Sequence, residues 1–131
     1  MKTKDQLILP ADYKYTDEHI WIKASENSYL IGISDFAQDQ LGEISYIELP
    51  EVGAHFDTHV QFGTVESLKS VNALYMPLSG TIEAVNNDLE DTPTLANIKC
   101  YEDGWIARIT LDNPNDLGTL LDANSYLDSL K

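Results

Sequence analysis

The chain has 131 residues, of which 43% are hydrophobic, and this composition is typical of a single globular domain. Its formal net charge is −14, from 8 Lys and Arg against 22 Asp and Glu, and so few cations cannot form the basic surface that nucleic-acid binding requires. The single cysteine, Cys100, excludes an intramolecular disulfide and a cysteine-based zinc site, and we expect a buried, unreactive thiol there.

Targeting signals and metal sites are not apparent in the sequence. No stretch approaches the roughly 20 apolar residues of a membrane-spanning helix. Residues 1–5 lack the apolar segment of a secretory signal, and an Arg-rich transit peptide is absent because Arg108 is the one arginine. The three histidines, His19, His55 and His59, are too few and too separated to predict a catalytic metal. We therefore expect a cytoplasmic protein that binds neither membranes nor nucleic acid.

The first part of the chain predicts an arm followed by two strands. Residues 1–14 are expected to form a loose arm, and the fold proper is expected to begin at Tyr15. Apolar residues at 20–22 and the alternation at 29–33 predict two strands, because turn-forming residues at 26–28 separate them.

A short helix is predicted next. Ser34 is a suitable N-cap for a helix of about two turns, and Gly42 supplies its stop. Asp35 is favourable at the positive end of that helix. Because so short a helix is unstable in isolation, we expect Phe36 and Leu41 to hold it by packing into the core.

The middle of the chain predicts a β-hairpin between two similar strands. Residues 42–47 and 80–85 share the pattern Gly-x-Ile-x-x-apolar, and each is predicted to be a strand. Between them, residues 60–65 alternate in polarity, and an apolar run that includes Leu74 follows residues 66–70. This pattern predicts a tight hairpin with Lys69 at its tip.

The last third of the chain predicts one strand between helical segments. Residues 86–97 form a polar connection with room for one helical turn, and residues 104–111 predict a strand. Two short helices complete the chain, the first capped by Asn113 and the second by Asp122. The side chains that we expect to be mainly buried are Trp21, Phe36, Ile47, Phe62, Trp105 and Ile109.

Two segments around the predicted hairpin resemble the lipoyl-lysine hairpin of glycine cleavage system H proteins. That family typically reads V-E-S-V-K and then Pro-x-S-G; the corresponding parts here are Val-Glu-Ser-Leu-Lys at 65–69 and Pro-Leu-Ser-Gly at 77–80. Biotin carriers usually have methionine on both sides of their lysine, whereas Leu68 and Ser70 flank Lys69 here. The resemblance, which spans residues 15–130, therefore points to lipoyl rather than biotinyl attachment.

The resemblance implies a mostly β fold, a barrel-sandwich hybrid of the lipoyl/biotinyl type with short helices, two of them at the C-terminus. One carrier domain would cover residues 1–131, with its β-sandwich core at 15–111 and its C-terminal helices at 113–130. It also implies a non-catalytic, monomeric carrier with lipoic acid bound covalently to Lys69. Glu66 would be a residue that the lipoylating enzyme recognises.

The same resemblance implies a function and a set of partners. Such a carrier shuttles the aminomethyl group of glycine between glycine decarboxylase, aminomethyltransferase and dihydrolipoamide dehydrogenase, after a lipoate ligase or octanoyltransferase has modified its lysine. Two alternatives stay open at this point. One is an H-like carrier that relays lipoyl groups to 2-oxoacid dehydrogenases or serves a redox response, and the other is an H-like structural protein that is never lipoylated.

The resemblance also implies a cleft that holds the loaded arm. The family uses polar residues near a His-Glu-Trp triplet and an aspartate four residues after the modified lysine. Here Ile20 and Ala73 occupy those places, which would leave the cleft short of carboxylates. Glu18, two residues before Ile20, is an alternative carboxylate if the local loop turns it inward. The candidate arm-docking residues are therefore Glu18, Ile20 and Ala73.

Overall fold

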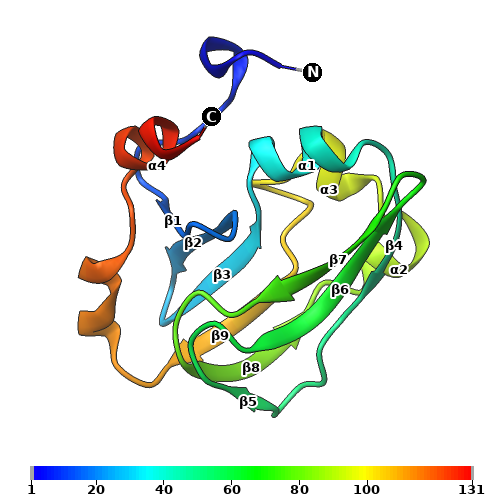
Figure 1. The fold of residues 1–131 in the computed structure, drawn as a ribbon. Coiled ribbons are helices and arrows are strands. Elements are labelled where there is room, and N and C mark those ends of the chain that lie inside the picture. The colour runs from blue at the N-terminus through cyan, green and yellow to red at the C-terminus, as the bar shows by residue number, and fades with distance from the viewer. Residues whose placement is uncertain (1, 131) are drawn as a thin grey trace.

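A computed structural model describes residues 2–130, so Met1 of the expected arm and Lys131 lie outside the described residues (Figure 1). The described chain forms two antiparallel sheets. Their strands are β1 (Lys14–Tyr15), β2 (Ile20–Ser25), β3 (Ser28–Ile33), β4 (Ile44–Glu48), β5 (His55–Phe56), β6 (Gln61–Ser67), β7 (Val71–Tyr75), β8 (Gly80–Val85) and β9 (Ala107–Leu111). One sheet has the order β1-β2-β3-β9-β8-β5 and the other the order β4-β6-β7.

The helices are short and lie at the edges of the sandwich (Figure 1). They are α1 (Asp35–Leu41), α2 (Asp88–Asp91), α3 (Leu95–Ile98) and α4 (Ala123–Ser129), with 3-10 turns η1 (Lys4–Gln6) and η2 (Pro114–Thr119). The predicted mostly β fold with short helices is confirmed. Within residues 2–130, no helix is long and apolar enough to cross a membrane, and no group of three His, Cys, Asp or Glu side chains is arranged to hold a metal ion.

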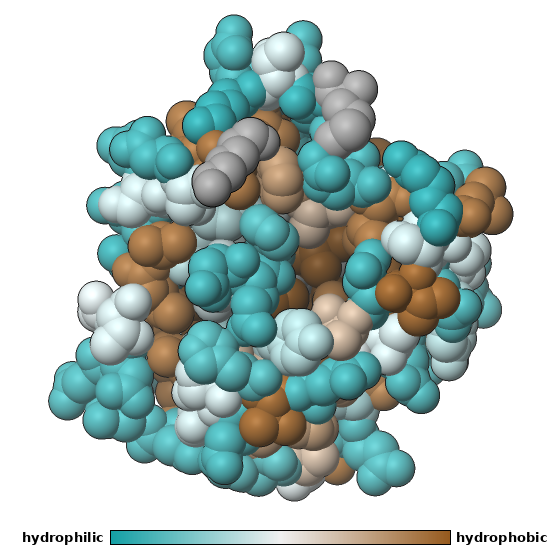
Figure 2. Space-filling model, viewed as in Figure 1, coloured by the Kyte–Doolittle hydropathy of each residue, from teal (hydrophilic) through white to brown (hydrophobic). Residues whose placement is uncertain are grey.

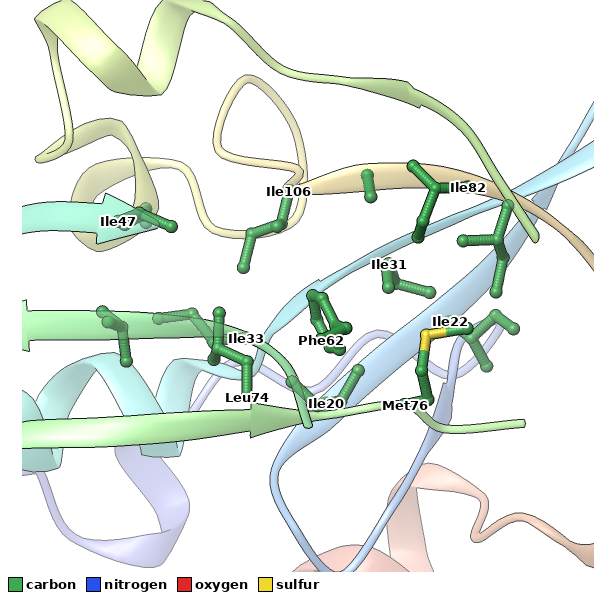
Figure 3. Packing of buried hydrophobic residues seen from close by; sticks show 14 of the residues in the cluster. Ile20, Ile22, Ile31, Ile33, Ile47, Phe62, Leu74, Met76, Ile82 and Ile106 are labelled. Atoms are coloured by element: carbon green, nitrogen blue, oxygen red, sulfur yellow. The ribbon is translucent and has the colours of Figure 1, made fainter. Parts of the chain in front are cut away.

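The main core lies between the two sheets, where apolar side chains from alternate positions of facing strands meet (Figure 3). Ile47, Phe62 and Ile109 are between 0% and 4% exposed there, as predicted. Trp21 is also fully buried, but it belongs to a second, more aromatic cluster, beside which α4 packs on β1. That cluster consists of Tyr13, Tyr15, Trp21, Tyr126 and Leu130.

Cys100 lies beside this aromatic cluster, and its side chain is buried. Its backbone carbonyl accepts a hydrogen bond of 2.9 Å from the Trp21 indole, and its thiol is buried. Burial raises the pKa of that thiol to about 12, so the reactive thiolate is not populated at neutral pH. The predicted burial of this cysteine is confirmed, and its raised pKa favours the less reactive thiol form.

The N-terminal arm is anchored to α1 and is less loose than the sequence suggests. The ammonium group of Lys2 lies 2.7 Å from a carboxylate oxygen of Asp35, and the backbone N–H of Ile8 donates to the same oxygen at 2.8 Å. The backbone N–H of Asp35 in turn donates to the Tyr101 hydroxyl at 2.9 Å. A buried carboxylate needs such partners, and Asp35 is only 4% exposed, so the arm supplies part of what keeps α1 in place.

Phe36 and Trp105 are buried less completely than the other four side chains that we expected to be mainly buried. Phe36 lies in the first turn of α1 at the edge of the sandwich, and its ring packs 4.9 Å from the ring of His19. Trp105 precedes β9, which begins at Ala107 rather than at residue 104. The Trp105 carbonyl accepts from the side chain of Asn86 at 2.8 Å, so this part of the backbone is held by a loop contact instead of the sheet ladder.

Two helical segments also differ from the sequence expectation. The polar connection at 86–97 contains two helical turns, α2 and the start of α3, where one was expected. The first C-terminal helix is the 3-10 turn η2, although Asn113 caps it as predicted. A regular helix cannot continue there because Leu121 exchanges two backbone hydrogen bonds of 2.9 Å with Tyr15 and is held extended.

We predict that Ile109→Ala lowers the free energy of unfolding by roughly 2–5 kcal/mol, because it leaves a cavity in the main core. The matched control is Ile98→Ala, since Ile98 is 73% exposed on α3 whereas Ile109 is fully buried. That control should change stability by less than about 0.5 kcal/mol. Chemical denaturation of both variants checks this, and equal losses would contradict the placement of Ile109 in the core.

Candidate functional site

The β6–β7 hairpin presents Lys69 at its tip, as the sequence predicts. Glu66 pairs with Val71 at the end of the ladder, and the backbone N–H of Ser67 donates to the Ser70 carbonyl at 2.9 Å. The Ser67 hydroxyl oxygen accepts from the backbone N–H groups of Lys69 and Ser70 at 3.2 and 3.3 Å. One serine therefore satisfies the turn backbone and fixes where the lysine leaves the hairpin.

The Lys69 side chain is exposed and extends over the C-terminal end of α1. A β-carbon built on Gly42 would lie 2.9 Å from the Lys69 Cε atom and 3.7 Å from its Nζ atom. The carbonyl end of a helix favours a positive charge, so this position is favourable for the lysine ammonium. Among the described residues, no carboxylate forms a salt bridge with Lys69, and its amine is accessible from solvent.

A cleft of about 410 Å³ lies between α1 and the edge strand β7, close to the hairpin. In Figure 2, brown hydrophobic atoms form the floor of a hollow near the centre of this face, with teal residues around it. The floor of the cleft is apolar and its rim is mixed, with a carboxylate and an imidazole among the lining groups. The lining residues are Glu18, His19, Ile33, Phe36, Ala37, Gln40, Leu41, Val65, Asn72, Ala73, Leu74 and Tyr75.

The cleft follows α1 from one end to the other. Gly42, next to the C-terminal end of α1, lies against Lys69, and Phe36, in its first turn, packs on His19. A helix of seven residues is about 10 Å long at 1.5 Å per residue. Lys69 therefore lies near the Leu41 end of the cleft without lining it, and Glu18 and His19 line the other end.

Glu18 lines the cleft, and its carboxylate contacts a histidine from another loop. Its Oε1 atom lies 2.8 Å from Nδ1 of His59, and its backbone N–H donates to the Thr16 hydroxyl at 3.2 Å. His59 has a left-handed backbone with φ of 69°, a conformation that non-glycine residues adopt at a cost. Glu18 is therefore a carboxylate residue at the end of the cleft that is far from Lys69.

His19 is the neighbouring polar group, and it is largely enclosed. Its Nδ1 atom lies 2.7 Å from the hydroxyl of Tyr126, and its ring packs against that of Phe36. Burial lowers the pKa of His19, although the nearby carboxylates of Asp17 and Glu18 act in the opposite direction. The net effect favours the neutral imidazole.

Two of the three candidate docking residues line the cleft in the structure, and the third does not. Ala73 and Glu18 line it, whereas Ile20 does not. Ile20 is only 1% exposed and belongs to the main core, because alternate residues of β2 face opposite sides and residue 20 faces inward. The assignment of Ile20 to the docking cleft was therefore wrong.

Glu66 lies on the outer face of the three-stranded sheet, away from the cleft. It is paired with Tyr46 of β4 and Val71 of β7, so the three side chains form one cross-strand row. Tyr46 is 51% exposed, Val71 64%, and Leu68 in the adjoining turn 80%. This row and Leu68 form an exposed apolar surface, with one carboxylate in it, next to Lys69.

His19 and Tyr126 are the site residues that the sequence did not identify as such. His19 was considered only as a metal ligand, and Tyr126 was not singled out. They are 107 positions apart, and no local pattern connects them. The adjacent Glu18 was the one available signal, because it marked the same loop.

Comparisons with known proteins show which sequences and structures this chain resembles. The sequence model of the family described as "Glycine cleavage H-protein" matches residues 13–131. The chain is 49% identical over 118 residues to the glycine cleavage system H protein of Symbiobacterium thermophilum, covering 90% of this chain and 92% of that protein. It is 48% identical over 118 residues to that of Listeria welshimeri, covering 90% and 94%.

A solved structure shows the same fold. The crystal structure of a glycine cleavage system H protein from Mycobacterium marinum superimposes with a TM-score of 0.85 at 32% identity, covering 92% of this chain and 97% of that one. The two-sheet sandwich described above is therefore the barrel-sandwich fold of lipoyl-type domains, as predicted.

We predict that Gly42→Ala destabilises the protein by about 1–3 kcal/mol, because Gly42 has φ of 74° and ψ of −158°, a combination that only glycine adopts freely. The added methyl group would also displace the Lys69 side chain. Gly118→Ala is the matched control, since a β-carbon there meets no atom within 4 Å. Denaturation curves for the two variants measure the difference, and an unchanged Gly42→Ala protein would contradict this geometry.

Proposed function

This chain belongs to the glycine cleavage H-protein family and is a lipoyl carrier of the glycine cleavage system, and we propose that Lys69 is the residue that carries the lipoyl group. The observation that supports Lys69 is its place at the tip of a fixed hairpin and at the open end of a cleft. The family match favours this role over lipoyl relay to 2-oxoacid dehydrogenases or a redox response.

The cleft has the character that a lipoyl arm requires. Its floor is formed by Ile33, Leu41, Val65 and Leu74, which suit an acyl chain, and its far end carries polar groups. When bound, the lipoyl group supplies a disulfide that opens and closes by thiol exchange. The chain's own residues position this arm, exclude water from it along α1 and offer hydrogen-bonding groups at its end.

Glu18 is the group that we assign to the cargo. The carried aminomethyl group has an amine that is protonated at neutral pH, and a carboxylate in a partly desolvated cleft accepts a charge-assisted hydrogen bond from it. Such a bond contributes roughly 1.5–3 kcal/mol. At the position where the family has a glutamate, this chain has Ile20, which faces the core. We therefore assign the role of that carboxylate to Glu18.

The modifying enzyme would contact the outer face of the hairpin. Glu66 and the exposed side chains of Tyr46, Leu68 and Val71 surround Lys69 on that face. A lipoate ligase or octanoyltransferase with an apolar, basic surface is complementary to it, as the net charge of −14 would favour. Attachment converts the ammonium of Lys69 to an uncharged amide.

The remaining assignments complete the proposal. The protein is a non-catalytic, monomeric carrier, and glycine decarboxylase, aminomethyltransferase and dihydrolipoamide dehydrogenase are its partners in turn. We propose the cytoplasm as its location. All three partners must reach Lys69, and its side chain is exposed at the tip of the hairpin.

We predict that co-expression with a lipoate ligase adds one lipoyl group to the wild-type protein and none to Lys69→Arg. Arginine retains the positive charge at this position, but its guanidinium group cannot be lipoylated. Lys23→Arg serves as a control, because Lys23 is a surface lysine on β2 that should not be modified. Intact-mass measurement decides, and a lipoyl mass gain that survives in Lys69→Arg would contradict the assignment.

We predict that Glu18→Gln accelerates the spontaneous loss of the aminomethyl cargo by roughly 10- to 100-fold, the equivalent of one charge-assisted hydrogen bond. The lipoylated protein is loaded with glycine and decarboxylase, the enzyme is removed, and formaldehyde release is followed. Glu51→Gln, at an exposed carboxylate outside the cleft, should release at the wild-type rate. Equal rates for Glu18→Gln and wild type would exclude Glu18 from this role.

A further inference from the structure

Three polar side chains from distant parts of the chain form a chain of short hydrogen bonds beneath the cleft. The Tyr126 hydroxyl lies 2.7 Å from Nδ1 of His19 and 2.7 Å from the hydroxyl of Ser34. Ser34 and Tyr126 are both 0% exposed. The three groups connect α4 with the N-terminus of α1 and with the loop that carries Glu18.

The direction of these hydrogen bonds follows from the acceptor that is available to each hydroxyl proton. Ser34 already accepts from the backbone N–H of Ala37 at 3.2 Å as the N-cap of α1. Among the described residues, the oxygen of Tyr126 is the hydrogen-bond acceptor found for the Ser34 proton. Ser34 therefore donates to Tyr126, and the Tyr126 proton is left to donate to Nδ1 of His19. The opposite order would bury the Ser34 hydroxyl proton with no acceptor, which is unfavourable.

This order determines the state of the imidazole. An Nδ1 atom that accepts a hydrogen bond carries no proton, so His19 is the neutral tautomer with its proton on Nε2. Protonating His19 would reverse the whole chain of bonds. The aromatic groups packed against the ring come from Phe36 and Tyr126 and carry no charge, and the carboxylates that act on it are those of Asp17 and Glu18.

We propose that Tyr126 is a positioning residue that fixes His19 as a neutral Nε2–H donor at the far end of the cleft. This rests on the proposed function. There His19 donates to a sulfur atom at the end of the lipoyl arm, while Glu18 accepts from the amine of the cargo. A donor and an acceptor side by side suit an arm end that presents both a sulfur and an ammonium group. The C-terminal helix, which does not line the cleft, thus determines what the cleft offers.

The first test uses the unlipoylated protein, so it does not depend on Lys69. Nitrogen-15 NMR of labelled histidine reports which ring nitrogen of His19 carries the proton between about pH 5 and 8. The proposal predicts a single Nε2–H tautomer in the wild type and a mixture of both tautomers in Tyr126→Phe. A wild-type Nδ1–H tautomer, or an unchanged single tautomer in Tyr126→Phe, would overturn it.

Tyr15→Phe is the matched control for that variant. Tyr15 is also 0% exposed, stacks on Tyr126 at 4.9 Å, and donates its hydroxyl to the Pro10 carbonyl at 2.8 Å. Its loss removes a buried hydroxyl without touching His19, so the His19 tautomer should remain as in the wild type. If Tyr126→Phe does not fold, the wild-type tautomer alone still decides the outcome.

The second test addresses the arm. In protein whose lipoylation is verified by mass, the Nε2–H signal of His19 should shift relative to that of unlipoylated Lys69→Arg, and Tyr126→Phe should reduce that shift. An unchanged His19 signal in the lipoylated protein would overturn the donor role. It would leave the attachment at Lys69 intact, because the mass measurement establishes that separately.

Discussion

The site depends on the placement of α1, a seven-residue helix that could not persist without its contacts. Its N-terminus is capped by Ser34, which α4 holds through Tyr126, and its first residue, Asp35, is paired with the N-terminal arm. At its other end, the carbonyl of Gly42 accepts from the side chain of Asn97 at 2.8 Å. Segments from both chain ends and from α3 therefore converge on α1, and the cleft and the resting place of Lys69 follow from its position.

In this arrangement the hairpin backbone is fixed, whereas the side chain of Lys69 is exposed. The hairpin turn is fixed by Ser67, while Lys69 itself has no ion-pair partner among the described residues. The cleft next to it combines an apolar floor with the paired polar groups of Glu18 and His19. A carrier requires this combination, because its arm must leave for each partner enzyme and return to a site that excludes water.

The sequence predicts best the features that local chemistry determines. The hairpin with Lys69, the Ser34 cap and the Asp122 cap are all confirmed, since turn and cap residues act on their own backbone. The features that the sequence did not predict depend on tertiary packing. Ile20 faces inward because of how β2 packs in the sheet, and the link between His19 and Tyr126 joins residues that only the folded chain brings together.

The central claim is that an arm on Lys69 lies along α1 with its end at Glu18 and His19. Nuclear Overhauser contacts in lipoylated protein with labelled methyl groups test this most directly. We expect contacts from the arm's methylene groups to the methyl groups of Leu41 and Val65 near the lysine, and from its ring to the Phe36 and His19 side chains at the far end. Contacts confined to the outer face of the hairpin, at Leu68 and Val71, would contradict the account.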